Sequence, residues 1–272
     1  MIRFVKHAAR LLAGFFMSED RREKADSATG QGGNAERRKD PTERQSQGEP
    51  GASSRAADFV DDALTFERLA QFCPDAERYA PYLAQAAFRY DIDTPLRLSH
   101  FLAQLAHESG GFQRTRENLN YSVDALLSLF GRHRISERKA RMYGRSDAHP
   151  ANPTAIANNI YGGPWGAHNL GNTEPGDGYR YIGRGLKQIT GRYNYRQCSL
   201  VLFGDLRLMN QPELLEQPEA ACLSAGWFWD RKRLNAYADT DDGETITRRI
   251  NGGLNGFDQR MQWLDKAKAV FV

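Results

Sequence analysis

The stretch PLRLSHFLAQLAHESGGF at residues 95–112 decides the fold. Its apolar residues recur at intervals of three and four, which is the period of one face of an α-helix. Thr94 is a good N-terminal cap, Pro95 suits a first turn, and the paired glycines mark the end. The stretch therefore predicts a long helix that carries Glu108 in its last turn. The predicted apolar face comprises Leu98, Phe101, Leu102, Leu105 and Ala106.

The same helical period recurs on both sides of this stretch. Residues 144–182 are instead rich in Gly, Asn, Pro and Tyr and predict a long loop. Strand signals are few and short, so the predicted fold class is mainly α with a large loop-built region. Further helices are expected near 65–72, from 80 to just before 91, and over 122–130, 218–230, 245–250 and 258–271.

The charge balance separates the N-terminal segment from the rest of the 272 residues. Residues 1–57 hold 11 Lys/Arg and 8 Asp/Glu, whereas residues 58–272 hold 26 of each, so the net charge of +3 belongs to the first segment. A dedicated nucleic-acid binder usually has a strongly basic domain, and we therefore expect no nucleic-acid partner. No apolar run reaches the roughly 18 residues that span a membrane.

The N-terminal part is expected to consist of two segments. Residues 1–17 place three basic residues before a short apolar run. This pattern leaves open a weak signal peptide or anchor, a short helix in weak contact with a membrane or partner, and a terminal helix without a role. Residues 18–57 are almost free of large apolar groups and predict a disordered linker. Residues 58–272 would then form the globular domain, which we take to be a monomer.

The three cysteines, Cys73, Cys198 and Cys222, are odd in number and widely spaced. This pattern is neither a disulfide framework nor a zinc motif. We interpret them as reduced thiols of a protein that folds in a reducing compartment. One disulfide with one free cysteine is the alternative.

Glu117 follows Glu108 by nine residues, and the glycines between them interrupt the helix. A turn at that point can bring the two carboxylates to face each other. Inverting glycosidases use two carboxyls about 6.5–9.5 Å apart, one as an acid and one to activate water. The helix C-terminus disfavours a carboxylate at Glu108, and we expect desolvation by Phe112 and Trp165 to add to this effect. The alternative is that Glu117 is an ordinary surface residue.

Four blocks of sequence follow one another along the chain: AHESGGF (106–112) with ENLNYS (117–122), YIGRGLKQITGRYNY (181–195), ACLSAGWFW (221–229) and ITRRINGGLNGFDQR (246–260). In this order they resemble glycoside hydrolase family 19, especially its bacterial chitinases and phage endolysins. The resemblance spans about residues 100–265 and implies a lysozyme-like fold, with two helical lobes around a substrate cleft.

The resemblance also implies the chemistry. Glu108 would be the general acid, Glu117 the general base, and Thr190 would help to hold the attacking water. The reaction would be hydrolysis of a β-1,4 bond next to an N-acetylated sugar, with inversion of the anomeric centre. No metal or organic cofactor is implied.

Substrate contacts are implied for a second set of residues. Gln188, Asn194 and Asn251 would bind sugar hydroxyls and N-acetyl groups, and Arg260 would join the carboxylates in a charge network. Trp165 is our candidate for a sugar-stacking platform. Structural alternatives are that Gln188 and Asn194 pin loops, that Asn251 serves a turn, and that Arg260 is a surface charge. We expect core positions for Tyr193, Tyr195, Trp227 and Trp229.

The motifs do not separate chitin from peptidoglycan, because both contain N-acetylglucosamine. We favour a cell-wall lytic enzyme acting on peptidoglycan, because the chain shows no carbohydrate-binding module, lacks a disulfide set and resembles the compact bacterial and phage members. The alternatives are a chitinase and, in another class, a non-catalytic glycan-binding protein. The enzyme would be made in the cytoplasm and act at the bacterial cell wall or periplasm, or after export.

Overall fold

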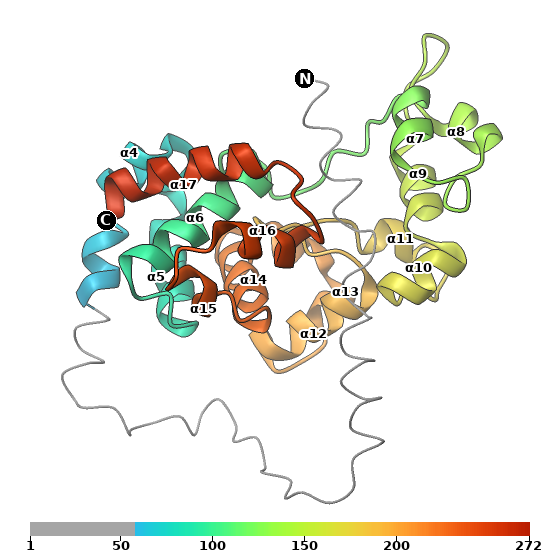
Figure 1. The fold of residues 1–272 in the computed structure, drawn as a ribbon. Helices are drawn as coiled ribbons and strands as arrows, with labels where there is room; N and C mark the ends of the chain where they lie inside the picture. The colour runs from blue at the N-terminus through green and yellow to red at the C-terminus, as the bar shows by residue number, and fades with distance from the viewer. Residues whose placement is uncertain (1–57) are drawn as a thin grey trace, which may run out of the picture.

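The computed structural model describes residues 58–272, which form helices joined by loops (Figure 1). Strand pairing among these residues is limited to three isolated bridges. The predicted mainly α fold is thus confirmed. The expected N-terminal segment 1–17 and linker 18–57 lie outside the described residues.

The larger lobe contains the helices that share one hydrophobic core. Its central element is α6 (Pro95–Ser109), which is buried along most of its length. The C-terminal helix α17 (Phe257–Phe271) packs along α6, and α14 (Pro218–Arg231) packs against α5 (Ala80–Arg89) (Figure 1). The other members are α4 (Phe66–Phe72), α12 (Arg192–Phe203), α13 (Arg207–Asn210), α15 (Asn235–Ala238), α16 (Gly243–Asn251) and the 3-10 helices η2 (Pro74–Tyr79) and η3 (Pro212–Glu216).

The smaller lobe has a separate hydrophobic core, which includes Tyr121, Ile156 and Tyr161. It stands at the upper right of Figure 1 and is joined to the larger lobe through residues 110–122 and 171–191. The two expected lobes are therefore present. The helices of the smaller lobe are α7 (Val123–Leu129), α8 (Glu137–Tyr143), α9 (Pro153–Ile160) and α10 (Gly163–Leu170), with α11 (Asp177–Arg180) packed against α9.

The ends of α6 are where the sequence predicts them. Thr94 Oγ1 accepts a hydrogen bond from the Arg97 backbone nitrogen at 3.3 Å. At the other end, Gly110, Gly111 and Phe112 follow one another with φ of 65°, 76° and 62°. This left-handed region is accessible to glycine and costly for other residues. The chain consequently reverses its direction directly after the last turn of α6.

The sequence predicts a loop over residues 144–182, and this prediction is wrong because α9, α10 and α11 form there. Asn152 caps α9 by accepting from the Ala155 backbone nitrogen at 3.0 Å. The glycines reflect close packing as well as turns, since a Cβ on Gly166 would lie 2.0 Å from the Tyr161 carbonyl oxygen. Helices α8 and α12 are also additional to the predicted set.

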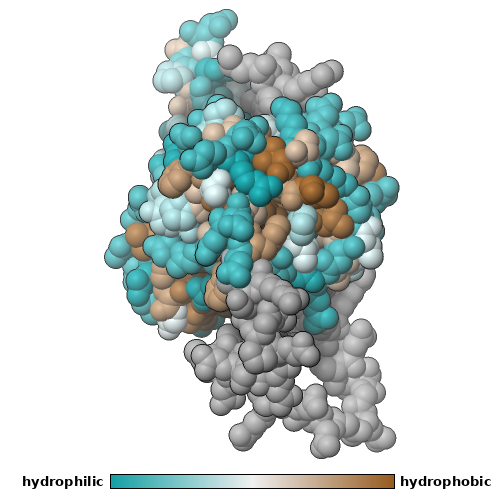
Figure 2. Space-filling model, turned by 90° about the vertical axis from the view of Figure 1, so that its left-hand side faces the viewer, coloured by the Kyte–Doolittle hydropathy of each residue, from teal (hydrophilic) through white to brown (hydrophobic). Residues whose placement is uncertain are grey.

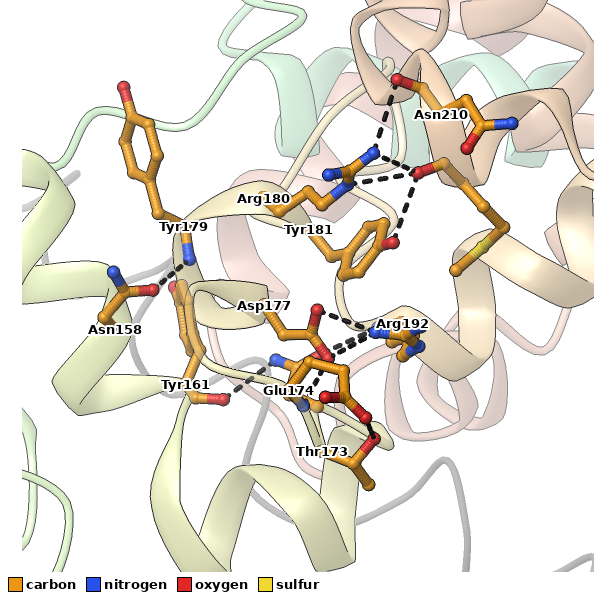
Figure 3. Close-up of polar contacts among 12 residues, drawn as sticks. Asn158, Tyr161, Thr173, Glu174, Asp177, Tyr179, Arg180, Tyr181, Arg192 and Asn210 are labelled. Carbon is orange, nitrogen blue, oxygen red and sulfur yellow. Dashed lines mark hydrogen bonds and ion pairs between the residues drawn. The ribbon is translucent and has the colours of Figure 1, made fainter.

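A polar junction fixes the loop that leads from the smaller lobe to the larger one (Figure 3). Buried Asp177 accepts from Arg192 Nη1 with both oxygens at 2.9 Å and from the Glu174 backbone nitrogen at 3.0 Å. The Tyr179 backbone nitrogen donates to Asn158 Oδ1 at 2.8 Å. Because Asn158 belongs to α9 and Arg192 begins α12, this junction connects the two lobes.

On the face shown in Figure 2, hydrophobic side chains lie in small groups among hydrophilic ones. Phe66, Phe88 and Val272 are the most exposed large hydrophobic residues within 58–272. Over the same range, no helix combines the length and the apolar character needed to cross a membrane. Each of the three cysteines is buried and forms no disulfide.

Candidate active site

Glu108 lies in the last turn of α6, and its side chain is fully buried. Arg260 of α17 donates from Nη2 to Glu108 Oε1 at 2.6 Å. Lys187 places its Nζ 3.6 Å from the same oxygen. Nη1 of Arg260 also donates to Oε1 of Gln104, which is one turn before Glu108. Two cations from separate segments therefore hold this carboxylate.

These surroundings differ from the predicted ones, in which aromatic side chains desolvate Glu108. The Phe112 ring packs against Phe72 and Tyr79 in the larger core. Trp165 packs against the core of the smaller lobe. Positively charged neighbours favour the ionised form of a carboxyl group, whereas apolar ones favour the protonated form.

The contact between Lys187 and Glu108 was not predicted from the sequence. Lys187 directly precedes Gln188 in the block YIGRGLKQITGRYNY (181–195). Its side chain is almost fully buried, with Nζ 4.5 Å from the centroid of the Phe228 ring. Burial lowers the pKa of the Lys187 ammonium; Glu108 opposes this effect, and Arg260 adds to it. No periodicity marks this residue, because it lies in a loop.

Glu117 is bound by two neutral donors. The Gly183 backbone nitrogen donates to Oε1 at 2.6 Å, and the Tyr161 hydroxyl donates to Oε2 at 2.7 Å. Burial raises the pKa of the Glu117 carboxyl, and these two donors, followed by the charges of Arg184 and Arg134, partly offset the rise. Both oxygens of this carboxylate are thus oriented, and the alternative of an ordinary surface glutamate is not supported.

Gly183 also brings Gln188 and Thr190 close to Glu117. A Cβ placed on this glycine would lie 2.9 Å from Gln188 Oε1, 3.3 Å from Thr190 Oγ1 and 3.5 Å from Glu117 Cβ. Thr190 is almost fully buried, and its hydroxyl donates to the Gln188 carbonyl oxygen at 3.0 Å. Three of the predicted site residues therefore meet around one glycine.

The loop 181–191 that carries these residues is fixed by its own contacts. Gln188 has a left-handed backbone, with φ of 59°, which is strained for a residue with a side chain. Its Nε2 donates to the Gly185 carbonyl oxygen at 2.9 Å. The amide group of Gln188 therefore helps to fix the loop, as the structural alternative for this residue expects. Arg184 anchors the loop to the larger lobe by donating from Nε to Glu216 Oε1 at 2.7 Å.

The two asparagines of the predicted site differ in their contacts. Buried Asn194 donates from Nδ2 to the Thr190 carbonyl oxygen at 2.8 Å, and its Oδ1 accepts no hydrogen bond from the residues that the structure describes. Asn251 accepts from the Gly253 backbone nitrogen at 2.9 Å and donates to the Asn255 carbonyl oxygen at 3.0 Å. Asn194 Oδ1 is thus a buried acceptor without a hydrogen-bond partner among the described residues, whereas the Asn251 side chain holds a turn.

Arg260 and Trp165 complete the predicted set. Arg260 has no exposed side-chain surface, so the surface-charge alternative is wrong and its link to Glu108 is present. Trp165 lies in α10, and the guanidinium carbon of Arg134 is 3.8 Å from its ring centroid. One face of this ring is therefore covered by Arg134. Of the expected core aromatics, Tyr195, Trp227 and Trp229 are buried, and Tyr193 is half-buried.

Other parts of the molecule do not contribute to this arrangement. A surface pocket of about 320 Å³, lined in part by Arg97, Asp230 and Asp239, contains none of the predicted site residues. The part of the chain from 58 to 272 contains no group of three His, Cys, Asp or Glu side chains arranged to hold a metal ion.

Comparisons with known proteins identify the family. No family model matches the chain. An endochitinase from Arabidopsis thaliana is 28% identical over 183 residues, which cover 67% of this chain and 46% of that protein. The crystal structure of chitinase C from Streptomyces griseus has a TM-score of 0.50 at 20% identity, covers 77% of this chain and 92% of its own, and shares the fold.

A bacterial relative is more similar in sequence. A Haemophilus influenzae protein described as containing a glycosyl hydrolase family 19 domain is 42% identical over 163 residues, which cover 59% of this chain and 72% of the relative. This relative belongs to the same family that the four ordered sequence blocks and the paired glutamates resemble. The chain therefore belongs to glycoside hydrolase family 19 and is a glycosidase.

Proposed function

We propose that this protein hydrolyses β-1,4 bonds next to N-acetylated sugars in peptidoglycan, at the bacterial cell wall and with inversion. The observation that carries the proposal is the contrast between its two glutamates. Glu108 is held by cations on the larger lobe, and Glu117 is held by neutral donors, one of them Tyr161 of the smaller lobe. Glycosidases act through two carboxyl groups, and the inverting outcome is the one that the resemblance to family 19 implies.

In this mechanism, Glu108 protonates the leaving glycosidic oxygen. Glu117 removes a proton from a water molecule that Thr190 orients. The water oxygen forms a bond to the anomeric carbon from the opposite face as the bond to the leaving oxygen breaks, which inverts the centre. Tyr161 keeps Glu117 in place, and Arg260 stabilises the carboxylate that Glu108 becomes.

The charge of the smaller lobe supports an anionic substrate. Residues 131–149, which we call the basic tip, hold six Lys/Arg and two Asp/Glu, whereas the remainder of 58–272 holds 20 and 24. Peptidoglycan carries peptide carboxylates and chitin is uncharged, so a positive potential attracts only peptidoglycan. The tip surrounds α8 at the outer end of the lobe (Figure 1). Its exposed basic residues are Arg132, Arg138, Lys139, Arg141 and Arg145.

A paired turnover assay tests this proposal. Wild type and Glu108→Gln are incubated with purified peptidoglycan and with soluble chitin oligomers, and the products are identified by mass. We expect wild type, and not the variant, to release glycan fragments from peptidoglycan. Added salt should slow this reaction more than any cleavage of the uncharged oligomers, because it screens the basic tip. Cleavage of chitin alone would establish the alternative, a chitinase, which the names of the plant and Streptomyces relatives favour.

Tyr161→Phe should move the acidic limb of the kcat/KM profile to higher pH. The hydroxyl of Tyr161 donates to the charged form of Glu117 and so lowers the pKa of that carboxyl. The base must be ionised, and activity is lost as the pH falls through this pKa. Removal of a hydrogen bond to a charged group raises the pKa by about one unit. Tyr179→Phe is the control, since the Tyr179 hydroxyl accepts from Arg116 instead; equal profiles for the two variants would contradict the assignment.

Gly183→Ala should lower kcat by about 10- to 100-fold with a small loss of thermal stability. The backbone of Gly183 is not left-handed, so the added methyl acts through its contacts with Gln188 and Thr190. A displacement of catalytic groups by about 1 Å costs a factor of this size. Gly253→Ala is the matched control, because its nearest atom would be 3.9 Å away. If both variants retain full turnover, the grouping around Gly183 has no part in catalysis.

A further inference from the structure

Three segments of the larger lobe place positive charges near Glu108. Arg260 of α17 and Lys187 of the loop 181–191 both contact Glu108 Oε1. The positive charge of Lys232, at the end of α14, also acts on Lys187. On α6 itself, the titratable neighbour is His107, which is buried. Two of these cations, Arg260 and Lys187, contact the same oxygen of Glu108.

The fold does not explain why a lysine occupies position 187. The loop is anchored by other contacts, such as Arg184 to Glu216 and the amide of Gln188. Burial of an ammonium is costly, and an apolar side chain of the same length could pack against Phe228 at a lower cost. What an apolar residue could not supply is a positive charge 3.6 Å from Glu108 Oε1.

We propose that Lys187 is a positioning residue that adjusts the strength of Glu108 as a proton donor. When Glu108 transfers its proton to the leaving oxygen it becomes a carboxylate, and a nearby ammonium stabilises this form as it develops. The same contact favours the carboxylate before catalysis, so fewer molecules hold the proton at a given pH. Lys187 thus increases acid strength at the expense of the protonated fraction. This inference rests on the proposed role of Glu108.

Lys187→Met and Lys187→Arg test the inference through the pH dependence of kcat/KM. Methionine removes the charge and can still pack against Phe228, whereas arginine keeps the charge. Because the general acid must be protonated, activity is lost as the pH rises through its titration. An opposite charge at this distance lowers the pKa of a carboxyl group by about 1–3. Without that charge, in Lys187→Met, the alkaline limb of the profile should move to higher pH by about one pH unit or more. The limb should stay in place in Lys187→Arg.

The outcomes separate this inference from the proposed function. An alkaline limb that stays in place in Lys187→Met, whatever happens to kcat, would overturn the role of Lys187. Activity that survives in Glu108→Gln would overturn the general-acid assignment itself. Thermal unfolding of each variant shows whether it is folded, and Lys187→Gln provides the same loss of charge if methionine prevents folding.

Discussion

Glu108→Gln should lower kcat/KM on peptidoglycan by about 10²- to 10⁴-fold, the usual contribution of a general acid. The amide has the shape of the carboxyl group, and its oxygen can still accept from Arg260 Nη2. It cannot release a proton to the leaving oxygen. Initial rates of glycan release, measured well below the unfolding temperature of the variant, provide the test.

The same substitution should also destabilise the protein. It leaves the buried charges of Arg260 and Lys187 without the carboxylate that neutralises them. Loss of one member of a buried ion pair costs about 3–5 kcal/mol of unfolding free energy. Glu213→Gln, on an exposed glutamate, is the control for both measurements. A Glu108→Gln variant that keeps its rate would show that another group donates the proton.

Glu117→Ala should lower turnover by a similar factor, about 10²- to 10⁴-fold, because no base remains to activate the water. Azide, which attacks without losing a proton, should restore part of the rate. The space vacated beside Thr190 lies on the face from which we expect water to attack, so the product should be the α-glycosyl azide. Product analysis by mass and NMR identifies the anomer.

Glu108→Gln with azide is the control for this second experiment. That variant keeps the base and lacks the acid, and azide cannot replace the missing proton, so no rescue is expected. A β-glycosyl azide from Glu117→Ala would show that Glu117 is not the base of an inverting reaction, since an inverting attack cannot retain the configuration.

Local signals in the sequence sufficed for α6 and its two ends. A cap at Thr94, a helical apolar period and a glycine pair act over a few residues, and these features were found as predicted. Arg260 came from the family resemblance, and the other partners of the carboxylates were not predictable in the same way. Tyr161 reaches Glu117 from a helix end in a region that composition marks as a loop, and Lys187 lies in a loop without any period.

Composition also gave a wrong secondary-structure prediction where glycine serves close packing rather than a turn. In residues 144–182 it predicted a loop, whereas Gly166 is required because the Tyr161 carbonyl leaves no room for a side chain. Asn251 shows the reverse difficulty. Its motif fits both a sugar contact and a turn, and the hydrogen bonds to Gly253 and Asn255 show the turn.

The complete burial of the Glu108 side chain has a consequence for substrate entry. In the conformation described this carboxylate has no surface open to a glycan, so we expect productive binding to need an opened conformation of lower population. The apparent dissociation constant is then the intrinsic constant divided by the population of the opened form. Because Glu117 is tied to the smaller lobe through Tyr161 and Glu108 to the larger lobe, that population depends on how the two cores meet. A substitution deep in either core can therefore change the affinity for glycan while every residue at the site stays the same.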